Sequence, residues 1–172
     1  MHVPVLLHDV TKLLDPTPGE FLVDGTLGRG GHTKELIAKL GKGTLLGLDR
    51  DPTRLEDVSV ELGAFIKDNT LEVSFTAIHR GYEELKEIVI EQGKKPDGLL
   101  LDLGFASDQL DPERGFSFMQ NGPLQMTYDP QAPSLIEQLK KLSEKELATM
   151  LKEYSNERYN KRVARVIKLR IK

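Results

Sequence analysis

The chain has 172 residues, no cysteine and a formal net charge of −3, with 38% hydrophobic and 30% charged residues. This length fits about one domain with a buried core, and the composition is typical of a globular protein. The lack of cysteine excludes disulfides and thiolate metal sites. No apolar stretch is long enough to span a membrane, and the first residues lack the features of a signal peptide, so we expect a cytoplasmic protein without membrane contact.

The charge is distributed unevenly along the chain. Residues 161–172 hold six basic side chains and no acid, so residues 1–160 carry a net charge of −9. A basic segment of this kind either contacts the phosphates of a nucleic acid or forms a solvated helix face. The sequence alone leaves both interpretations open.

Apolar runs alternate with helix-compatible stretches between residues 20 and 103, after an expected amphipathic helix over residues 5–14. This alternation predicts an α/β protein with a doubly wound, Rossmann-like parallel sheet. Right-handed crossovers predict the strand order 3-2-1-4. The expected strands are 20–24, 44–49, 71–75 and 98–103, and the expected helices are 32–41, a helix starting at Asp51-Pro52, and 82–92. The fourth run is fully apolar, as expected of a strand buried on both faces.

The most informative stretch is residues 23–32, where an apolar run ends at Asp24 and glycines follow at 25, 28, 30 and 31. Strand, glycine turn and helix in this order open a nucleotide-binding βαβ unit. Glycine permits the sharp turn, and the N–H groups at the start of the next helix suit a carboxylate or a phosphate. Asp24, Asp49 and Asp102 all fall at the carboxyl ends of expected strands, where ligands of such sheets bind.

Two cofactors compete for this turn. Dinucleotide sites use three spaced glycines followed by an acid about 20 residues on. Gly28 and Gly30 fit this spacing, but Thr33 stands where the third glycine is required, whereas Asp49 supplies the acid for a ribose. S-adenosylmethionine has a ribose but no pyrophosphate. Asp24 can hold its cationic amino group, directly or through water, and the N–H groups of residues 30–32 can hold its carboxylate. The sequence favours S-adenosylmethionine and leaves an NAD-dependent oxidoreductase as the alternative.

The chain changes character after Gly104. Residues 105–133 are rich in turns and are expected to form a substrate-facing loop. Two capping boxes, Ser134 to Glu137 and Ser143 to Glu146, open two helices, and a third is expected over residues 156–170. We therefore expect a cofactor-binding domain over 1–104, the loop over 105–133 and a small helical subdomain over 134–172. Its expected inward-facing residues are Leu135, Ile136, Leu139, Leu142, Leu147, Met150, Leu151, Tyr154, Tyr159, Val163, Val166, Ile167 and Ile171.

Several motifs follow one another in an order that is specific to one family. They are His2-Val3-Pro4-Val5-Leu6, Asp24-Gly25-Thr26-Leu27-Gly28-Arg29-Gly30-Gly31-His32, Asp49-Arg50-Asp51-Pro52, Leu101-Asp102-Leu103-Gly104, Gln109-Leu110-Asp111, Pro112-Glu113-Arg114-Gly115-Phe116-Ser117-Phe118, Gly122-Pro123-Leu124, Glu157-Arg158 and Lys161-Arg162. In these motifs the chain resembles the RsmH (MraW) family of S-adenosylmethionine-dependent enzymes, which methylate N4 of a cytidine in small-subunit ribosomal RNA.

The resemblance implies a class I methyltransferase sheet, S-adenosyl-L-methionine as the cofactor, and small-subunit ribosomal RNA or the small ribosomal subunit as the partner. We expect Asp102, or a carbonyl of the turn that follows it, to act as the catalytic hydrogen-bond acceptor. Together with the turn analysis, the expected cofactor-binding residues are Asp24, Gly28, Gly30, Gly31, His32, Asp49, Tyr82 (stacking near the adenine), Asp102 and Gln109. The expected RNA-binding residues are Arg114, Lys161, Arg162 and Arg165.

The chain also departs from the family pattern. Compared with the family pattern, residues 105–108, Phe-Ala-Ser-Asp, have one hydroxyl fewer and one charge more. Residues 125–127, Gln-Met-Thr, stand where the family has an aspartate and an arginine. The resemblance covers the N-terminal part of the family, and we expect the sheet to be incomplete. The alternative is therefore a non-catalytic relative that binds cofactor or RNA and completes its sheet with a partner, as in a homodimer.

Overall fold

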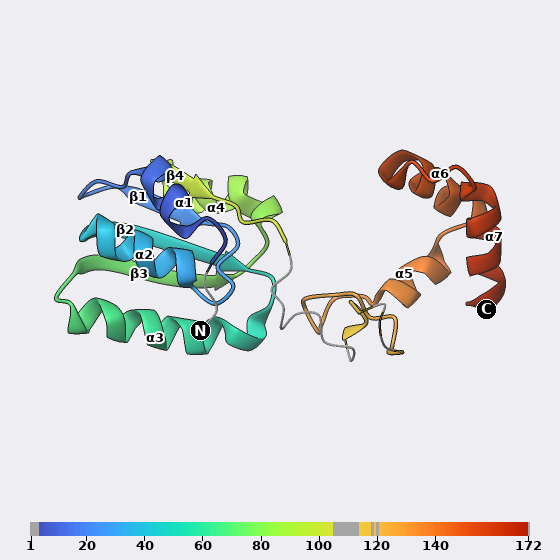
Figure 1. The fold of residues 1–172 in the computed structure, drawn as a ribbon, viewed down its shortest axis with the longest axis horizontal. Helices are drawn as coiled ribbons and strands as arrows, with labels where there is room; N and C mark the ends of the chain where they lie inside the picture. Colours follow the sequence, from blue (N-terminus) through green and yellow to red (C-terminus); the bar gives the residue numbers. More distant parts are fainter. Residues whose placement is uncertain (1–3, 105–113, 118, 120, 172) are drawn as a thin grey trace. The chain divides into compact units, whose positions relative to one another are not determined.

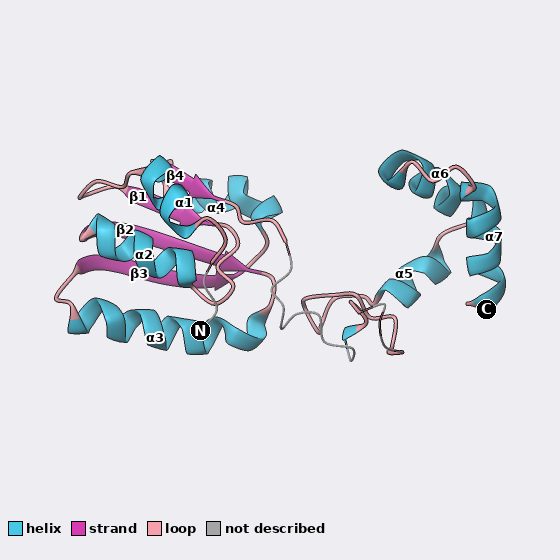
Figure 2. Ribbon diagram, viewed as in Figure 1, coloured by secondary structure: helices cyan, strands magenta, loops and turns pink. Residues whose placement is uncertain are grey.

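The computed structural model describes residues 4–104, 114–117, 119 and 121–171. The chain divides into two compact units, Met1–Gly104 and Phe105–Lys172. Figure 2 shows the strands in the first unit, with helices in both. The expectations for Gln109 and for residues 105–108 lie outside the described residues.

The first unit is built on four parallel strands in the order β3-β2-β1-β4, which confirms the predicted topology. In this sheet β1 (Phe21–Asp24) lies between β2 (Lys42–Asp49) and β4 (Gly98–Leu100), and β3 (Glu72–His79) lies on the far side of β2. Asp24 is in register with Gly47 of β2 and Leu100 of β4, and Asp49 is in register with His79. The carboxyl ends of all four strands therefore meet at one edge of the sheet.

Helices cover both faces of this sheet (Figure 1). On one face α1 (Leu7–Leu14), α2 (Gly31–Leu40) and α3 (Leu55–Asp68) enclose a core of leucine, isoleucine and valine. On the other face α4 (Leu85–Gln92) packs Ile88 against Val23 and Leu48. Side chains alternate between the two faces along β1, so Leu22 joins the first core while Phe21 and Val23 join the second. This double covering is what a parallel sheet requires.

Two helices of the first unit begin with a short 3₁₀ turn. Asp51 caps η1 (Pro52–Arg54), which leads into α3, because its carboxylate accepts a bond of 3.1 Å from the N–H of Thr53. This arrangement confirms the cap predicted at Asp51. The helix expected over residues 82–92 begins in the same way with η2 (Tyr82–Glu84).

The prediction for the fourth strand was wrong in length and in burial. The strand is Gly98–Leu100 rather than 98–103, and Leu99, Leu101 and Leu103 are 39%, 39% and 66% exposed. β4 is the outermost strand on its side of the described sheet and pairs with β1. An apolar run does not show whether a strand is central or outermost, because that depends on which neighbours the fold supplies.

Further boundaries differ from the prediction, and β2 begins at Lys42 rather than at residue 44. α1 starts two residues late because Leu6 takes a left-handed conformation with φ 53° ahead of the helix, and Leu13, expected on its apolar face, is 85% exposed. β3 extends to His79, because Phe75 and Ala77 continue the alternation that begins at Val73. No helix in the described ranges is long and apolar enough to cross a membrane.

The second unit contains α5 (Leu135–Lys141), α6 (Glu144–Ser155) and α7 (Asn160–Arg170). The third helix was expected from residue 156 but begins at Asn160, because Asn156 ends α6 in the left-handed conformation. Both predicted capping boxes are confirmed, at Ser134 and Ser143. Helices α6 and α7 pack against each other at an angle (Figure 1) around a small core of Leu147, Ala148 and Ala164. The two alanines allow the helices to approach closely.

Four of the residues that were expected in the core of this helical unit lie on its surface. Met150, Tyr154, Tyr159 and Val166 are 41%, 81%, 62% and 44% exposed. The core uses one narrow face of each helix, and these side chains project from the remaining faces. Hydrophobic spacing overestimated the core because it assumed a broader inward face than two helices in contact provide.

Candidate functional site

Asp24 closes β1 and fixes the glycine turn that follows it. Its side chain is 1% exposed. One carboxylate oxygen accepts bonds from the N–H and the hydroxyl of Thr26 at 3.0 and 3.4 Å, and the other accepts a bond of 2.6 Å from the hydroxyl of Thr33. Burial raises the pKa of Asp24, although the bonds from the two threonines act in the opposite direction. The carboxylate holds the turn from inside the protein.

The glycines at 28 and 30 take backbone conformations that few other residues adopt. Their φ angles are 51° and 70°, and a Cβ atom at Gly30 would lie 2.9 Å from Cγ1 of Val58 on α3. The N–H of Gly30 already donates a bond of 2.7 Å to the carbonyl of Leu27. The N–H groups of Gly31 and His32, at the start of α2, have no carbonyl partner within the helix. Of the three N–H groups expected to bind a carboxylate, these two suit that role.

Asp49 ends β2 with its carboxylate held in one orientation. One oxygen accepts a bond of 2.6 Å from the N–H of Gly28, and the other accepts a bond of 2.8 Å from the N–H of Asp51. The side chain is half-buried. Each carboxylate oxygen can accept a second bond, so an oriented acceptor stands at the edge of the glycine turn.

Asp102 is tied to the same turn through Thr26. The N–H of Asp102 donates a bond of 2.7 Å to the hydroxyl of Thr26, and the N–H of Gly25 donates a bond of 2.9 Å to the carbonyl of Leu100. These two bonds join the ends of β1 and β4. The carboxylate of Asp102 remains accessible, with a side chain that is 49% exposed.

His32 is buried next to Asp102 with its ring nitrogens unsatisfied. The residue is 7% exposed, and within the described part of the chain neither nitrogen has a hydrogen-bond partner. The distance from Nε2 to Oδ2 of Asp102 is 3.6 Å, which is too long for a hydrogen bond but within ion-pair range. Buried polar atoms without partners are rare and call for an explanation. A ligand bound at the start of α2 would supply partners.

Tyr82 approaches the turn from η2. A Cβ atom placed on Gly25 would lie 3.2 Å from Cβ of Tyr82 and 2.5 Å from Cδ2 of Leu101, so the missing side chain of Gly25 allows both to come close. Tyr82 is 43% exposed. Arg50, which follows β2, donates from Nε to Glu83 of η2 at 2.9 Å and ties the two loops together. The structure therefore gathers Asp24, the glycine turn, Asp49, Tyr82 and Asp102 at one edge of the sheet.

Two residues that organise this edge, Thr26 and Thr33, were not predicted from the sequence. The spacing from Asp24 to Thr26 is that of an Asx turn and could have indicated the first contact. Nothing in the sequence relates Thr33 to Asp24, because their bond depends on the angle at which α2 leaves the turn.

The second unit presents the expected RNA-binding residues of α7. Lys161, Arg162 and Arg165 are exposed, and none of the ion pairs found among the described residues involves them. Lys168 differs from them, because its ammonium group donates to the carbonyls of Leu139, Lys140 and Leu142 at 2.9, 3.2 and 2.7 Å. It caps the end of α5 and belongs to the structure of the unit. Arg114 lies in the turn-rich segment and already takes part in interactions.

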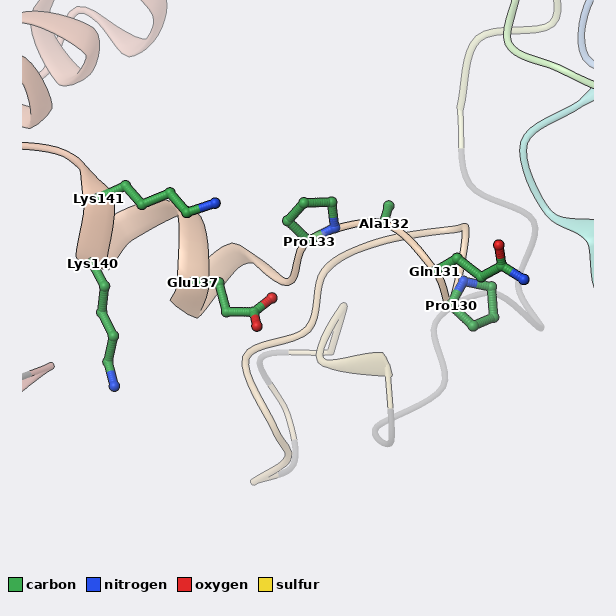
Figure 3. Close-up of a pocket in the computed structure, with 7 residues that line it drawn as sticks. All are labelled: Pro130, Gln131, Ala132, Pro133, Glu137, Lys140 and Lys141. Atoms are coloured by element: carbon green, nitrogen blue, oxygen red, sulfur yellow. The ribbon is translucent and has the colours of Figure 1, made fainter.

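A pocket of about 590 Å³ also lies in the second unit (Figure 3). It is lined by Pro130, Gln131, Ala132, Pro133, Glu137, Lys140 and Lys141. Glu137 already accepts bonds of 2.8 and 3.0 Å from the N–H and hydroxyl of Ser134, and these bonds hold its pKa below the usual range. The pocket contains none of the predicted site residues, and we assign it no role. No group of side chains in the described residues has the arrangement of a metal site.

A parallel sheet in this order, with a glycine turn after β1 and an oriented acid at the end of β2, is the arrangement typical of α/β proteins that bind nucleotide cofactors. The chain belongs to the MraW methylase family, whose model matches residues 1–172.

Solved structures with partial similarity include two methylase-related proteins. A methyltransferase homolog from Pyrococcus horikoshii is 23% identical, with 52% of this chain and 27% of that chain covered and a TM-score of 0.39. A putative rRNA-methylase from Clostridium thermocellum is 20% identical, with 51% of this chain and 46% of that chain covered and a TM-score of 0.40. The matched region thus spans less than half the length of either protein.

Proposed function

We propose that the chain binds S-adenosylmethionine and takes part in methylating N4 of a cytidine in small-subunit ribosomal RNA. The observation that carries the proposal is the buried imidazole of His32 at the start of α2, whose ring nitrogens have no hydrogen-bond partner among the described residues and which lies 3.6 Å from the carboxylate of Asp102. This arrangement occurs in a member of a methylase family.

The residues present fit the amino-acid end of this cofactor. The N–H groups of Gly31 and His32 would bind its carboxylate, and within the described part of the chain the ring nitrogens of His32 have no hydrogen-bond partner. Asp24 has both oxygens engaged with Thr26 and Thr33 and is buried. We therefore assign Asp24 to positioning the turn, with any effect on the ammonium group carried through water.

The nucleoside end would be held by Asp49 at the end of β2 and by Tyr82 in η2, which follows β3. Asp49 has its carboxylate oriented by two backbone N–H groups and can accept bonds from the ribose hydroxyls. The ring of Tyr82 is accessible beside Gly25 and can stack near the adenine. Gln109 completes the proposed set by family resemblance.

The chemistry requires a weak nucleophile to be positioned and assisted. When bound, S-adenosylmethionine supplies a methyl group on a sulfonium that an amine can attack. N4 of cytidine is a poor nucleophile because its lone pair is delocalised into the ring. Asp102 is accessible, and its backbone is fixed by Thr26, so its carboxylate can accept a hydrogen bond from the N4 amino group as positive charge develops.

The RNA would be held by cations of the second unit. Lys161, Arg162 and Arg165 on α7, together with Arg114, are proposed to neutralise phosphates, so binding is expected to weaken steeply with salt. The target base must be unpaired or flipped out of its stack to reach the cofactor.

Methyl transfer tests the proposal directly. Small ribosomal subunits that lack this modification are incubated with tritiated S-adenosylmethionine and the chain, beside a longer family member and the Asp102→Ala variant. We expect label on cytidine N4 with the wild-type chain and a loss of at least about a hundredfold with Asp102→Ala. Absence of label with the chain, when the longer relative labels the same subunits, would contradict the proposed activity and support a non-catalytic relative that binds cofactor or RNA.

The expected homodimer stays a proposal. β4 is the outermost strand on its side of the described sheet, and Leu99 and Leu101 on and beside it are exposed, a combination that favours pairing with another chain. Light scattering that gives the mass of a dimer would support it, and a monomeric mass at high concentration would contradict it.

A further inference from the structure

The turn between α6 and α7 exposes two tyrosines that the core does not use. Tyr154, in the last turn of α6, is 81% exposed, and Tyr159, just before α7, is 62% exposed. The small core of the unit is complete without them, since it consists of Leu147, Ala148 and Ala164 with neighbouring aliphatic side chains. We refer to residues 154–162 as the hairpin tip.

The hairpin tip has a fixed backbone. Asn156 ends α6 in the left-handed conformation with φ 52°, and its N–H donates to the carbonyl of Leu151. The carboxylate of Glu157 accepts a bond of 2.7 Å from the N–H of Tyr159, and the carbonyl of Glu157 accepts a bond of 3.0 Å from the side-chain amide of Asn160. The acid of the tip is therefore engaged with the backbone, and the tyrosines are attached to an ordered turn.

One cation contacts the ring of Tyr159, and two more follow in the chain. The guanidinium carbon of Arg158 lies 5.8 Å from the centre of the Tyr159 ring, which is within cation–π range. Lys161 and Arg162 follow in the first turn of α7 and are exposed. Accessible aromatic faces with basic side chains around them are the combination used to bind single-stranded nucleic acids, where bases stack and phosphates are neutralised.

We propose that the hairpin tip binds single-stranded RNA, with bases stacked on Tyr154 and Tyr159 and phosphates against Arg158 and Arg162. The charge of the tip selects this occupant, because its three cations face solvent while its acid is engaged. The inference rests on the proposed function in taking RNA as the substrate class. It adds a stacking site to the phosphate contacts proposed for α7.

The absence of tryptophan makes the tyrosines a direct probe. The chain has four tyrosines and no tryptophan, so its fluorescence reports on them. Binding of a short, unstructured, fluorescein-labelled cytidine and uridine oligonucleotide is measured by anisotropy, and quenching of tyrosine fluorescence is followed with the unlabelled oligonucleotide. The variants are Tyr154→Leu, Tyr159→Leu, the matching Tyr→Phe pair, and Leu169→Ala as an exposed apolar control on α7.

We expect each Tyr→Leu change to weaken binding by about tenfold, because the base then loses the aromatic face on which it stacks. The Phe variants are expected to stay within about twofold of wild type, because they keep the aromatic face, and Leu169→Ala is expected to bind as wild type does. Circular dichroism checks that every variant folds. Binding that is unchanged in both Leu variants would overturn the proposal. So would Leu variants that abolish self-association in light scattering without weakening RNA binding, because the tip would then be a contact between copies.

The same samples separate this inference from the proposed function. Binding of S-adenosylhomocysteine, measured by calorimetry, is expected to be unchanged in the Tyr→Leu variants. A wild-type chain that binds RNA through the tip but gives no heat with S-adenosylhomocysteine would contradict the proposed function and leave the inference standing. The reverse result would contradict the inference alone.

Discussion

The two units hold their charged groups in opposite ways. In the first unit the carboxylates of Asp24 and Asp49 accept bonds from backbone N–H groups and threonine hydroxyls, so their orientation is set before any ligand arrives. In the second unit Lys161, Arg162 and Arg165 extend into solvent on α7. A small cofactor of fixed shape requires acceptors at fixed positions, whereas long flexible cations can meet a polyanion without a fixed geometry. The contrast matches the two proposed ligands.

Lys168 shows that the contrast is set by contacts rather than by residue type. It belongs to the same basic run as Arg165, yet its ammonium group is held by three carbonyls at the end of α5. Charge and position in the sequence do not distinguish the two residues. Variants of the hydrogen-bonded groups should therefore change the stability of the fold, whereas variants of the exposed cations should change RNA binding.

The largest effect is expected from removing the buried carboxylate of the turn. Asp24→Ala leaves the hydroxyl of Thr33 and the N–H of Thr26 without their acceptor, and we expect a loss of about 3–5 kcal/mol of unfolding free energy. Urea denaturation measures it. Asp24→Asn keeps one acceptor oxygen and should lose less, and an Asp24→Ala protein as stable as wild type would refute the positioning role.

The difference in stability between wild type and Asp24→Asn is expected to change with pH in one direction. Because burial raises the pKa of Asp24 above its ordinary value of 3.8 in the folded state, the folded protein holds this proton more tightly than the unfolded chain. The contribution of this bound proton to the free energy of unfolding is therefore complete at pH values below the ordinary pKa of 3.8. It is lost as the pH rises through the raised pKa of the folded state. The stability of wild type relative to Asp24→Asn should fall over that range, and a difference that rises with pH would contradict the assignment.

A smaller effect is expected at Gly30, with Gly41 as a matched control. Both have positive φ, at 70° and 65°, but a Cβ at Gly30 would meet Val58 at 2.9 Å whereas none of the described atoms lies within 4 Å of one at Gly41. Gly41→Ala should lower the free energy of unfolding by about 1–2 kcal/mol, because alanine is strained in this left-handed backbone conformation. Gly30→Ala should cost about 1–3 kcal/mol more from overpacking. Equal losses in thermal unfolding would mean that α3 does not confine the turn.

Lys168 and Arg165 give the next comparison. Lys168→Met keeps the length of the side chain but removes three bonds to carbonyls, and we expect a loss of about 1–2 kcal/mol in stability. Arg165→Gln should leave the unfolding free energy within about 0.5 kcal/mol of wild type. If the two variants were equally stable, Lys168 would have to be counted with the surface cations.

The smallest effect is expected from single surface cations. Arg162→Gln should weaken RNA binding similarly for all sequences and lower the slope of log affinity against log salt by about 1. Anisotropy titrations at several salt concentrations measure this slope. A variant that kept the wild-type slope would remove Arg162 from the set of phosphate contacts.

The sequence predicted the parts of the fold that depend on local pattern. Alternating apolar runs, the cap at Asp51 and the two capping boxes gave the strand order and most helix starts. Features that depend on neighbours were missed. The exposure of Leu99 follows from the outermost place of β4, and that of Tyr154 follows from the narrow contact between α6 and α7.

In the candidate site, too, features set by local pattern could be predicted, whereas features set by packing could not. The acids at the strand ends could be predicted, because the parallel direction of the strands brings Asp24, Asp49 and Asp102 to one edge. The burial of Asp24 and its bond with Thr33 could not, because they depend on the angle of α2. The unsatisfied nitrogens of His32 likewise appear only once the helix is placed against Asp102.

Calorimetric titration of the chain with S-adenosylhomocysteine tests the central claim most directly. The account predicts one site in the wild-type chain and unchanged binding in Arg162→Gln. In Asp49→Asn we expect binding at least about tenfold weaker, because this variant removes the carboxylate proposed to accept hydrogen bonds from the ribose hydroxyls. No heat from the folded wild-type chain, or equal affinity in Asp49→Asn, would contradict the assignment of the glycine turn and its acids to this cofactor.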